Sequence, residues 1–475
     1  MKHFFDWFTE SGQRQQQAPW LILGKGPSYD LLHGSDVSGY RLMSLNHVVR
    51  EGPVELAHMI DIDVAVDCAQ AILDHAGMLV MPWYPHTGNL VGSKTLAQWV
   101  QEIPMLKQMD LQGRLLWYDL SQAKQRHGPG PVVKAAAFSA EAALNLLALA
   151  GVRKVRSLGI DGGTSYGNRF DDLKDTTRLN NGQPSYNVQF EGFARTIMAT
   201  AIDFAPLNVE SPIRVYVGSQ EEQMLSVKVL EHSIRRHASM TVEVHPLHRA
   251  GIAFERPREQ KNWPRTPFSF QRFAIPQLAG HRGRAIYLDS DMLVFRDIRA
   301  LWTLPFEGAD LLAAQAADGT SRKPQFSVML LDCARLGWSP GMVVESLDSG
   351  RLSYEQLMHD MALAKQVRAG ISPHWNSLEQ FDAAQTCLLH YTDMSTQPWV
   401  YARNRHGHLW VRELLMALDS GFIQIDEVRE HVARGWVRPS LLKQALAHKQ
   451  RLSPLSAYGW LADRRFIAPY KSIPL

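Results

Sequence analysis

The sequence predicts an α/β protein with two Rossmann-like domains and a helical C-terminal tail. Three observations support this fold class. Short apolar runs alternate with helical patterns in both halves, several of these runs end in Gly-rich turns, and a Pro-containing segment separates the halves. We therefore expect one domain over residues 1–210, a second over 211–405 and the tail over 406–475.

Length and composition agree with two cores. The chain has 475 residues, more than one ordinary core needs, and 45% of them are hydrophobic. The three cysteines, Cys68, Cys333 and Cys387, are far apart in the sequence. We therefore expect neither a disulfide framework nor a zinc site.

Charge and hydropathy argue against three other classes of protein: nucleic-acid-binding, membrane-spanning and secreted. A net charge of +3 is close to balance, and no motif combines aromatic with basic residues as RNA-binding proteins do, so no nucleic-acid partner is expected. No apolar run reaches the ~20 residues that a bilayer requires. Asp6 and Glu10 interrupt the N-terminus, so no signal peptide is expected and a cytoplasmic location is favoured.

The first domain is expected to contain a parallel sheet with helices on both faces. The predicted strands cover residues 19–23, 40–46, 63–67, 78–82 and 154–160, and an Ala/Leu-rich helix covers 139–150. In such sheets, ligands bind beyond the carboxyl ends of the strands. Backbone N–H groups at Gly24 and Gly26 could approach a phosphate there; a simple tight connection is the alternative. The polar stretch 162–187 is either a lid over this crevice or a solvated loop.

The second domain begins with a strand at 214–217, a Gly/Ser turn and an amphipathic helix over 222–236. Four further segments matter for the site: 268–276, which carries Arg272 on a helical face, 324–332, 371–376 and 388–392.

Asp289-Ser290-Asp291 is the most informative motif, because its two acids end the apolar run 284–288 and a second apolar run follows at once. Burying two carboxylates there costs several kcal/mol of desolvation free energy each, as is typical of buried ions, unless the carboxylates are paired or bind a metal. Carboxylate oxygens suit Mg²⁺ and Mn²⁺, which also bind phosphate oxygens. A turn or a helix cap is the alternative interpretation.

In its order of motifs, the region 212–402 resembles glycosyltransferase family 8. The shared motifs are the strand ending in Asp-Xaa-Asp, the Trp375-Asn376 segment, and His390 ahead of Pro398-Trp399. The resemblance implies a GT-A-type domain that binds a nucleotide sugar, most simply a UDP-sugar, with Mn²⁺ (or Mg²⁺) as cofactor. It implies that the metal ligands are Asp289, Asp291 and His390, and that donor-binding residues include Val217, Gly218, Arg272, Ser290, Asn376 and Trp399.

The resemblance also implies a reaction. Cleavage of the bond between sugar and diphosphate leaves negative charge on the oxygens of the diphosphate, and a bound metal stabilises this charge. Family members retain the anomeric configuration. Two catalytic positions depart from the family pattern: Gln325 replaces an amide that normally faces the sugar, and Asp360 is the nearest candidate for an acidic stretch.

Residues 18–200 distantly resemble family 42 sialyltransferases and the 6-hydroxymethylpterin diphosphokinase-like family. The resemblance implies a pocket for a nucleotide such as CMP, lined by Gly26, Ser28, Asn46, Ser139 and Asp161. The sialyltransferases use a His as general base after the strand that ends at Asp161, but residues 161–201 contain no His. A second transferase would need another base; otherwise the domain binds a ligand or acceptor without reacting.

The segment 431–475 is basic, with interleaved aromatic residues and Asp463 as its single acid. This composition suits peripheral contact with an anionic membrane surface, on the inner face of the membrane, near a lipid-linked acceptor. Packing of the aromatic residues onto the second domain is the equal alternative.

Three hypotheses follow for the whole chain. The first is a metal-dependent transferase that moves a sugar to a saccharide or lipid-linked acceptor, in the synthesis of bacterial surface polysaccharide or lipooligosaccharide. The second is a bifunctional enzyme whose first domain also uses a CMP-linked donor. The third is a carbohydrate-binding protein without activity.

Overall fold

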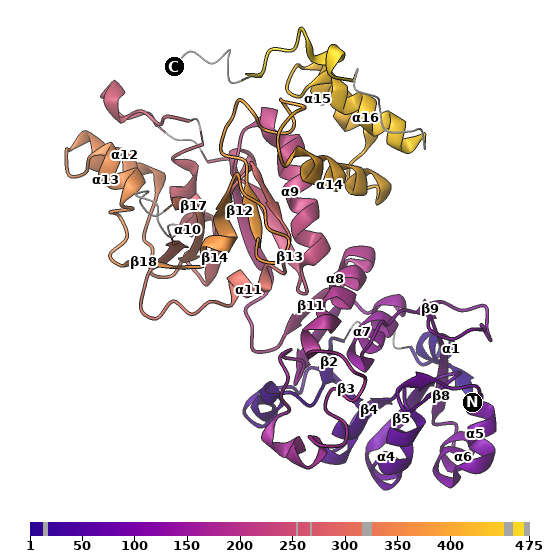
Figure 1. Ribbon diagram of the computed structural model, residues 1–475. Helices are drawn as coiled ribbons and strands as arrows, with labels where there is room; N and C mark the ends of the chain where they lie inside the picture. The colour runs from indigo at the N-terminus through magenta and orange to yellow at the C-terminus, as the bar shows by residue number, and fades with distance from the viewer. Residues whose placement is uncertain (13–17, 253–254, 267, 316–324, 451–458, 470–475) are drawn as a thin grey trace. The chain divides into compact units, whose positions relative to one another are not determined.

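The computed structural model describes residues 1–12, 18–252, 255–266, 268–315, 325–450 and 459–469. It confirms the α/β fold, with sheets flanked by helices and further helices towards the C-terminus (Figure 1). The chain divides into two compact units: Met1–Pro212 with Ala238–Thr241, and Ile213–His237 with Val242–Leu475. The first unit thus includes a short segment, Ala238–Thr241, that lies beyond the expected boundary at residue 210.

The first unit contains a nine-stranded sheet in which every pairing is parallel. Its strands, in sheet order, are β1 (Lys2–His3), β8 (Leu115–Leu120), β5 (Ala76–Pro82), β4 (Val54–His58), β3 (Arg41–Leu45), β2 (Trp20–Leu23), β10 (Lys154–Leu158) and β11 (Asp203–Pro206), while β9 (Val132–Val133) pairs with β8. Parallel strands need crossover connections, and the helices of this unit provide them.

Helices cover both faces of this sheet. Along β2, Trp20 and Ile22 pack into one core and Leu21 and Leu23 into the other, as the alternation of side chains along a strand requires. The first face carries α1 (Phe4–Glu10), α7 (Ser139–Leu149) and α8 (Gln189–Thr200); the second carries α3 (Ile62–Asp67), α4 (Ala69–His75), α5 (Leu96–Glu102) and α6 (Pro104–Leu111).

The prediction of a strand at 63–67 is wrong, because these residues belong to α3. Val64 and Val66 favoured a strand locally, but the buried positions are Ile62, Ala65 and Cys68, which recur every three residues as on one helical face. The strands β4 and β8 were not predicted.

The second unit contains a mixed sheet of six strands and a small sheet of three. The larger sheet has the order β13 (Val242–Pro246), β12 (Ile213–Gly218), β14 (Arg284–Asp289), β17 (Gln325–Asp332), β16 (Leu311–Ala314) and β18 (Val367–Ile371). The smaller has the order β15 (Met292–Val294), β20 (Leu388–His390) and β19 (Ser377–Leu378). The turn between β14 and β15 therefore joins the two sheets.

The described part of the expected tail is integrated into the second unit. It forms α14 (Gly407–Asp419), α15 (Ile425–Ala433) and α16 (Pro439–Lys449), which share a core with α9 (Met224–His237) and the small sheet. Trp410 is fully buried in this core. Within the described ranges, no helix combines the length and hydrophobicity that crossing a bilayer requires.

Candidate functional site

Backbone pairing brings the three expected metal ligands together. Asp289 ends β14 and Asp291 immediately precedes β15. β15 pairs antiparallel with β20, and this register sets Met292 opposite His390. In addition, the Tyr391 N–H donates to the Asp291 carbonyl at 2.8 Å. A residue about a hundred positions away in the sequence is thus held beside the acidic turn.

The side chains of Asp289, Asp291 and His390 form a compact donor set. One ligand atom from each lies within 4.8 Å of the other two. His390 Nε2 lies 3.0 Å from Asp291 Oδ1, and the exposed fractions of the side chains are 5% and 17%. Two largely buried carboxylates and an imidazole match the ligand types that bind Mn²⁺.

His390 is oriented from behind by Asn376, at the end of the 3₁₀ helix η9 (Pro373–Asn376). His390 Nδ1 lies 2.9 Å from Asn376 Oδ1, so Nδ1 carries the proton and donates it to this amide oxygen. In neutral His390, Nε2 then has its lone pair free towards Asp291. Metal-binding histidines are commonly fixed in this way.

Asp291 is held on one oxygen by a hydrogen bond and faces His390 with the other. Oδ2 accepts a hydrogen bond from Gln397 Nε2 at 2.9 Å, and this amide also donates to the Tyr391 carbonyl at 3.0 Å. Oδ1 is buried, has no assigned hydrogen bond among the described residues, and lies 3.0 Å from His390 Nε2. When His390 is neutral, the lone pair of Nε2 faces this oxygen, and a cation between the two atoms would relieve their repulsion. The donor set therefore fits a divalent metal ion.

Asp289 has two partners, Tyr287 in the same strand β14 and Arg272. Tyr287 donates from its hydroxyl to Asp289 Oδ1 at 2.6 Å, and Arg272 Nη2 lies 3.8 Å from the same oxygen. The Arg272 guanidinium lies 4.5 Å from the centre of the Tyr287 ring and donates to the Phe326 carbonyl at 2.9 Å. Arg272 comes from the 3₁₀ helix η8 (Gln271–Ala274) and is largely buried. Its positive charge offsets part of the negative charge of Asp289.

The pKa values reflect excess negative charge in this cluster. Burial raises the pKa of Asp289; Arg272 opposes this effect, and the neighbouring Asp291 adds to it. Burial alone would lower the pKa of His390, but the carboxylates of Asp291 and Asp289 outweigh it and raise that pKa. Both shifts keep a proton in the cluster when no metal is bound.

Gly218 allows Tyr287 to reach Asp289. The register of β12 and β14 sets Gly218 opposite Asp289. A Cβ atom at Gly218 would overlap the Tyr287 hydroxyl group. Any larger residue would displace the hydrogen bond on Asp289. Val217, the other residue expected near the base, is fully buried in the same strand.

The remaining candidates of this unit lie in different environments. Ser290 is buried within the acidic turn, and Trp399 is buried in the core that also contains Trp410, 5.4 Å away between ring centres. Asp360 is exposed after α13 (Tyr354–His359) and is not part of the donor set. The side chain of Gln325 lies outside the described residues. The sequence reasoning did not identify Tyr287 and Gln397 as site residues, although each is a polar residue within or beside an expected site segment.

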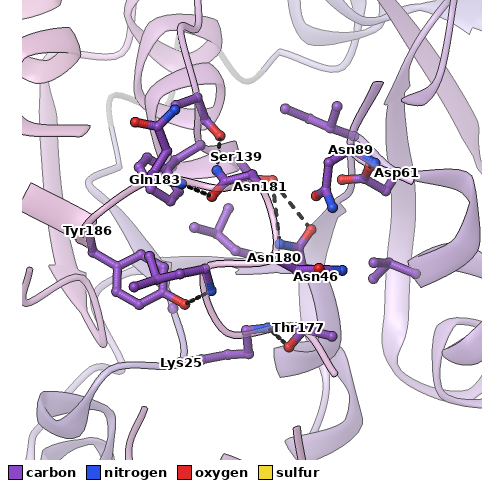
Figure 2. Close-up of a pocket in the computed structure, with 18 of the residues that line it drawn as sticks. Lys25, Asn46, Asp61, Asn89, Ser139, Thr177, Asn180, Asn181, Gln183 and Tyr186 are labelled. Atoms are coloured by element: carbon purple, nitrogen blue, oxygen red, sulfur yellow. Dashed lines mark hydrogen bonds between the residues drawn. The ribbon is translucent and has the colours of Figure 1, made fainter. Parts of the chain in front are cut away.

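The first unit has a cavity of about 720 Å³ where several of its parallel strands end (Figure 2). Of the residues expected to bind a nucleotide, Gly26, Asn46, Ser139 and Asp161 line it. Asn46 follows β3, and its side chain lies 3.4 Å from the Ser139 hydroxyl. The loop 162–187 contributes Tyr166, Thr177, Asn181 and Tyr186, among others, so it forms one wall.

Of the two alternatives for the turn at Gly24 and Gly26, the structure shows the tight connection. Gly24 N donates to Leu158 O and Gly26 N to Gly159 O, both at 2.8 Å. A Cβ atom at Gly26 would lie 2.6 Å from Asp161 Oδ2. The glycines instead allow the turns after β2 and β10 to approach closely. Ser28 is absent from the lining; it donates to Asp161 through its backbone N–H and its hydroxyl.

Comparison with known proteins finds a family match over part of the chain. Residues 193–366 match the sequence model that describes glycosyl transferase family 8. This stretch contains Asp289 and Asp291 and ends before Asn376 and His390. Protein CDI of Arabidopsis thaliana is 34% identical over 100 residues, which cover 20% of this chain and 38% of that relative. The chain thus matches well under half of the relative's length.

Several solved structures are similar at low identity. The apo-form glycosyltransferase GlyE of Streptococcus pneumoniae TIGR4 is 16% identical with a TM-score of 0.32, over 43% of this chain and 61% of its own. The galactosyltransferase LgtC, in complex with donor and acceptor sugar analogs, is 12% identical with a TM-score of 0.29, over 42% and 95%. The bifunctional glycosyltransferase WbbM is 11% identical with a TM-score of 0.28, over 67% and 62%.

Proposed function

We propose that the glycosyltransferase family 8 domain in residues 193–366, completed by Asn376 and His390, transfers a sugar from a nucleoside diphosphate sugar with a divalent metal ion. The observation that carries this proposal is the donor set Asp289, Asp291 and His390, in which buried Asp291 Oδ1 and His390 Nε2 face each other at 3.0 Å. Mn²⁺ is the preferred ion and Mg²⁺ the alternative. The donor is a UDP-sugar.

The protein's own residues have distinct roles in this proposal. Asp289, Asp291 and His390 would hold the metal, which supplies Lewis-acid stabilisation of the leaving diphosphate. Asn376 keeps the proton of His390 on Nδ1, and Gln397 fixes the orientation of Asp291. Arg272, beside Asp289, would bind a phosphate oxygen of the donor. The diphosphate would leave an oxocarbenium-like sugar that the acceptor hydroxyl attacks from the same face, with the hydroxyl proton passing to the departing phosphate oxygen; this route retains the anomeric configuration without a protein nucleophile.

The acceptor is a saccharide or a lipid-linked saccharide, and the product belongs to bacterial surface polysaccharide or lipooligosaccharide. Peripheral contact with anionic lipid through residues 431–475 would bring the enzyme to such an acceptor. Arg438 does not contribute to this contact, because it is buried and donates to the Pro398 carbonyl at 2.8 Å. Co-sedimentation with anionic liposomes tests the contact, and equal pelleting of a chain lacking 431–475 would refute it.

A thermal-shift screen of nucleotide sugars, with and without Mn²⁺, tests the proposed function. A ligand bound only by the folded state raises stability by RT ln(1 + [L]/Kd). We expect UDP-sugars to raise the melting temperature only when Mn²⁺ is present. Equal shifts without metal, or none for any nucleoside diphosphate sugar, would contradict the proposal.

A second candidate function belongs to the first unit. Its cavity lies at the carboxyl ends of parallel strands, where such sheets bind nucleotides, and amide and hydroxyl groups line it. We propose that it binds a nucleotide of the CMP type, as donor or as part of an acceptor. Calorimetric titration with CMP should show binding that Asn46→Ala weakens; unchanged affinity would count against it.

A further inference from the structure

We propose that His47 and Asp67, which line the cavity in the first unit, bind a divalent transition-metal ion of the Zn²⁺ type together with the neighbouring Cys68. This site lies in a different unit from Asp289, Asp291 and His390, so the inference does not depend on the proposed transferase reaction. We expected no zinc site because the three cysteines are far apart in the sequence. That separation does not exclude this site, because only one of its three ligands is a cysteine.

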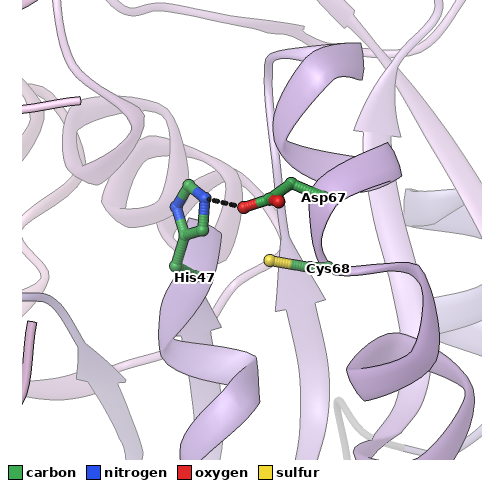
Figure 3. Close-up of side chains that lie close together, drawn as sticks. All are labelled: His47, Asp67 and Cys68. Atoms are coloured by element: carbon green, nitrogen blue, oxygen red, sulfur yellow. Dashed lines mark hydrogen bonds and ion pairs between the residues drawn. The ribbon is translucent and has the colours of Figure 1, made fainter. Parts of the chain in front are cut away.

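The three side chains converge from neighbouring elements (Figure 3). His47 lies in the 3₁₀ helix η2 (Asn46–Glu51) that follows β3, Asp67 ends α3, and Cys68 joins α3 to α4. His47 Nε2 lies 2.9 Å from Asp67 Oδ2. One ligand atom from each residue lies within 4.8 Å of the other two.

The arrangement places two of the three donors out of contact with solvent. The side chain of His47 is only 2% exposed, and its Nε2 is the nitrogen that faces Asp67, so Nε2 is the atom that would bind the ion. Cys68 is 1% exposed. Asp67 is the accessible member, with 62% of its side chain exposed. A cation reached through Asp67 would therefore be held mainly by buried donors.

The donor types select the metal. A thiolate, an imidazole and a carboxylate together favour Zn²⁺ over Mg²⁺ or Mn²⁺, whose preferred ligands are oxygens. Burial, aided by the positive charge of Lys25, lowers the pKa of His47 to about 4, so its imidazole is neutral and able to bind a metal at neutral pH. Burial raises the pKa of Cys68 to about 11, so metal binding must release the thiol proton.

The cavity supplies a reason for a cation at this place. Among the described lining residues, the charged side chains are Lys25, Asp61, Asp63, Asp67 and Asp161. Four carboxylates against one lysine would repel a phosphate. Three protein ligands leave a tetrahedral ion one position open, and His47 and Asp67 both line the cavity. The metal could thus accept an anionic oxygen of a cavity ligand.

Titration with Co²⁺ tests the inference without any activity assay. The full chain carrying Asp289→Asn and Asp291→Asn should be used, so that the family 8 site no longer binds the probe. Thiolate-bound Co²⁺ gives a strong near-ultraviolet charge-transfer absorption that oxygen and nitrogen ligands do not give. We expect this band to saturate at one equivalent, to be lost in Cys68→Ser, and to persist in the matched control Cys387→Ser.

His47→Gln provides a second variant in case Cys68→Ser does not fold. It keeps the thiol but removes the imidazole, so the Co²⁺ affinity should fall at least tenfold while circular dichroism stays unchanged. Absence of the band in the chain with all three cysteines would overturn the inference. A band that survives Cys68→Ser, or an affinity that His47→Gln leaves unchanged, would overturn it as well.

Discussion

At the scale of single residues, the candidate metal site joins two near neighbours in the sequence with one distant residue. Only Ser290 separates Asp289 from Asp291, so their convergence could be predicted directly from an acidic pair between apolar runs. His390 is distant, and only a family resemblance connected it with them; the structure brings all three together through the pairing of β15 with β20. Tyr287 and Gln397 could not be assigned, because a polar residue near a strand end has many uses until its partner is known.

The residue that orients His390 gives the first prediction. Replacing Asn376 with Ala removes the oxygen that accepts the Nδ1 proton, so His390 loses its fixed orientation. We expect Mn²⁺ affinity to fall about 10- to 100-fold, as for other partners of metal ligands. Isothermal titration with Mn²⁺ measures this change.

Two variants control for this prediction. Asn376→Asp keeps an acceptor oxygen and should recover much of the affinity. Asn262→Ala removes a side chain of similar burial elsewhere in the second unit and should bind Mn²⁺ normally. If Asn376→Ala binds Mn²⁺ as tightly as the unchanged chain, Asn376 does not position His390.

At the scale of elements, alternating apolar runs predicted the strands that carry the site, β2, β3, β10, β12 and β14. The strand predicted at 63–67 is a helix, because burial every three residues decided its structure over the β-branched valines. The glycine turns were placed correctly, and of their two predicted roles the structure shows the tight connection. Whether an N–H group faces a ligand or a neighbouring turn depends on contacts between β2 and β10, which no local pattern encodes.

The packing of α9 on α14 gives the second prediction. Glu413 on α14 accepts hydrogen bonds from His232 Nδ1 at 2.7 Å and from Arg236 Nη2 at 2.7 Å, and its side chain is 4% exposed. Glu413→Gln removes the charge that binds both partners. We expect the free energy of unfolding, measured with urea at pH 7, to fall by about 1.5–3 kcal/mol, as for hydrogen bonds to charged groups.

The same residue has a pH dependence of known sign. Burial alone would raise the pKa of Glu413, but the hydrogen bonds from His232 and Arg236 outweigh it and lower that pKa below 4.5. Its contribution to stability is therefore complete above pH 4.5 and is lost as the pH falls through the folded-state value. The stability difference between the unchanged chain and Glu413→Gln should shrink on acidification. A difference independent of pH would show that the charge of Glu413 is not what holds the two helices.

At the scale of the whole molecule, each of the two units carries a candidate ligand site of its own. Residues 193–366 carry the family 8 match, which includes the two acids of one site. The other site is the cavity of the first unit, which His47 and Asp67 line and which Cys68 adjoins. The sequence predicted the first position from the Asp289-Ser290-Asp291 motif, and the second because ligands of parallel sheets bind where strands end. It could not predict the second donor set, because nothing in the spacing of His47 and Cys68 differs from ordinary core residues.

The most direct measurement is calorimetric titration of UDP in the presence and absence of Mn²⁺, on the unchanged chain, on Asp291→Asn and on Asp332→Asn. Asp332 ends β17 opposite the first residue of β14, at the far end of that strand from Asp289, and serves as the matched control. We predict that Asp291→Asn loses Mn²⁺-dependent UDP binding and sugar transfer, while Asp332→Asn keeps both. Undiminished Mn²⁺-dependent binding and transfer in Asp291→Asn would contradict the assignment of the metal site.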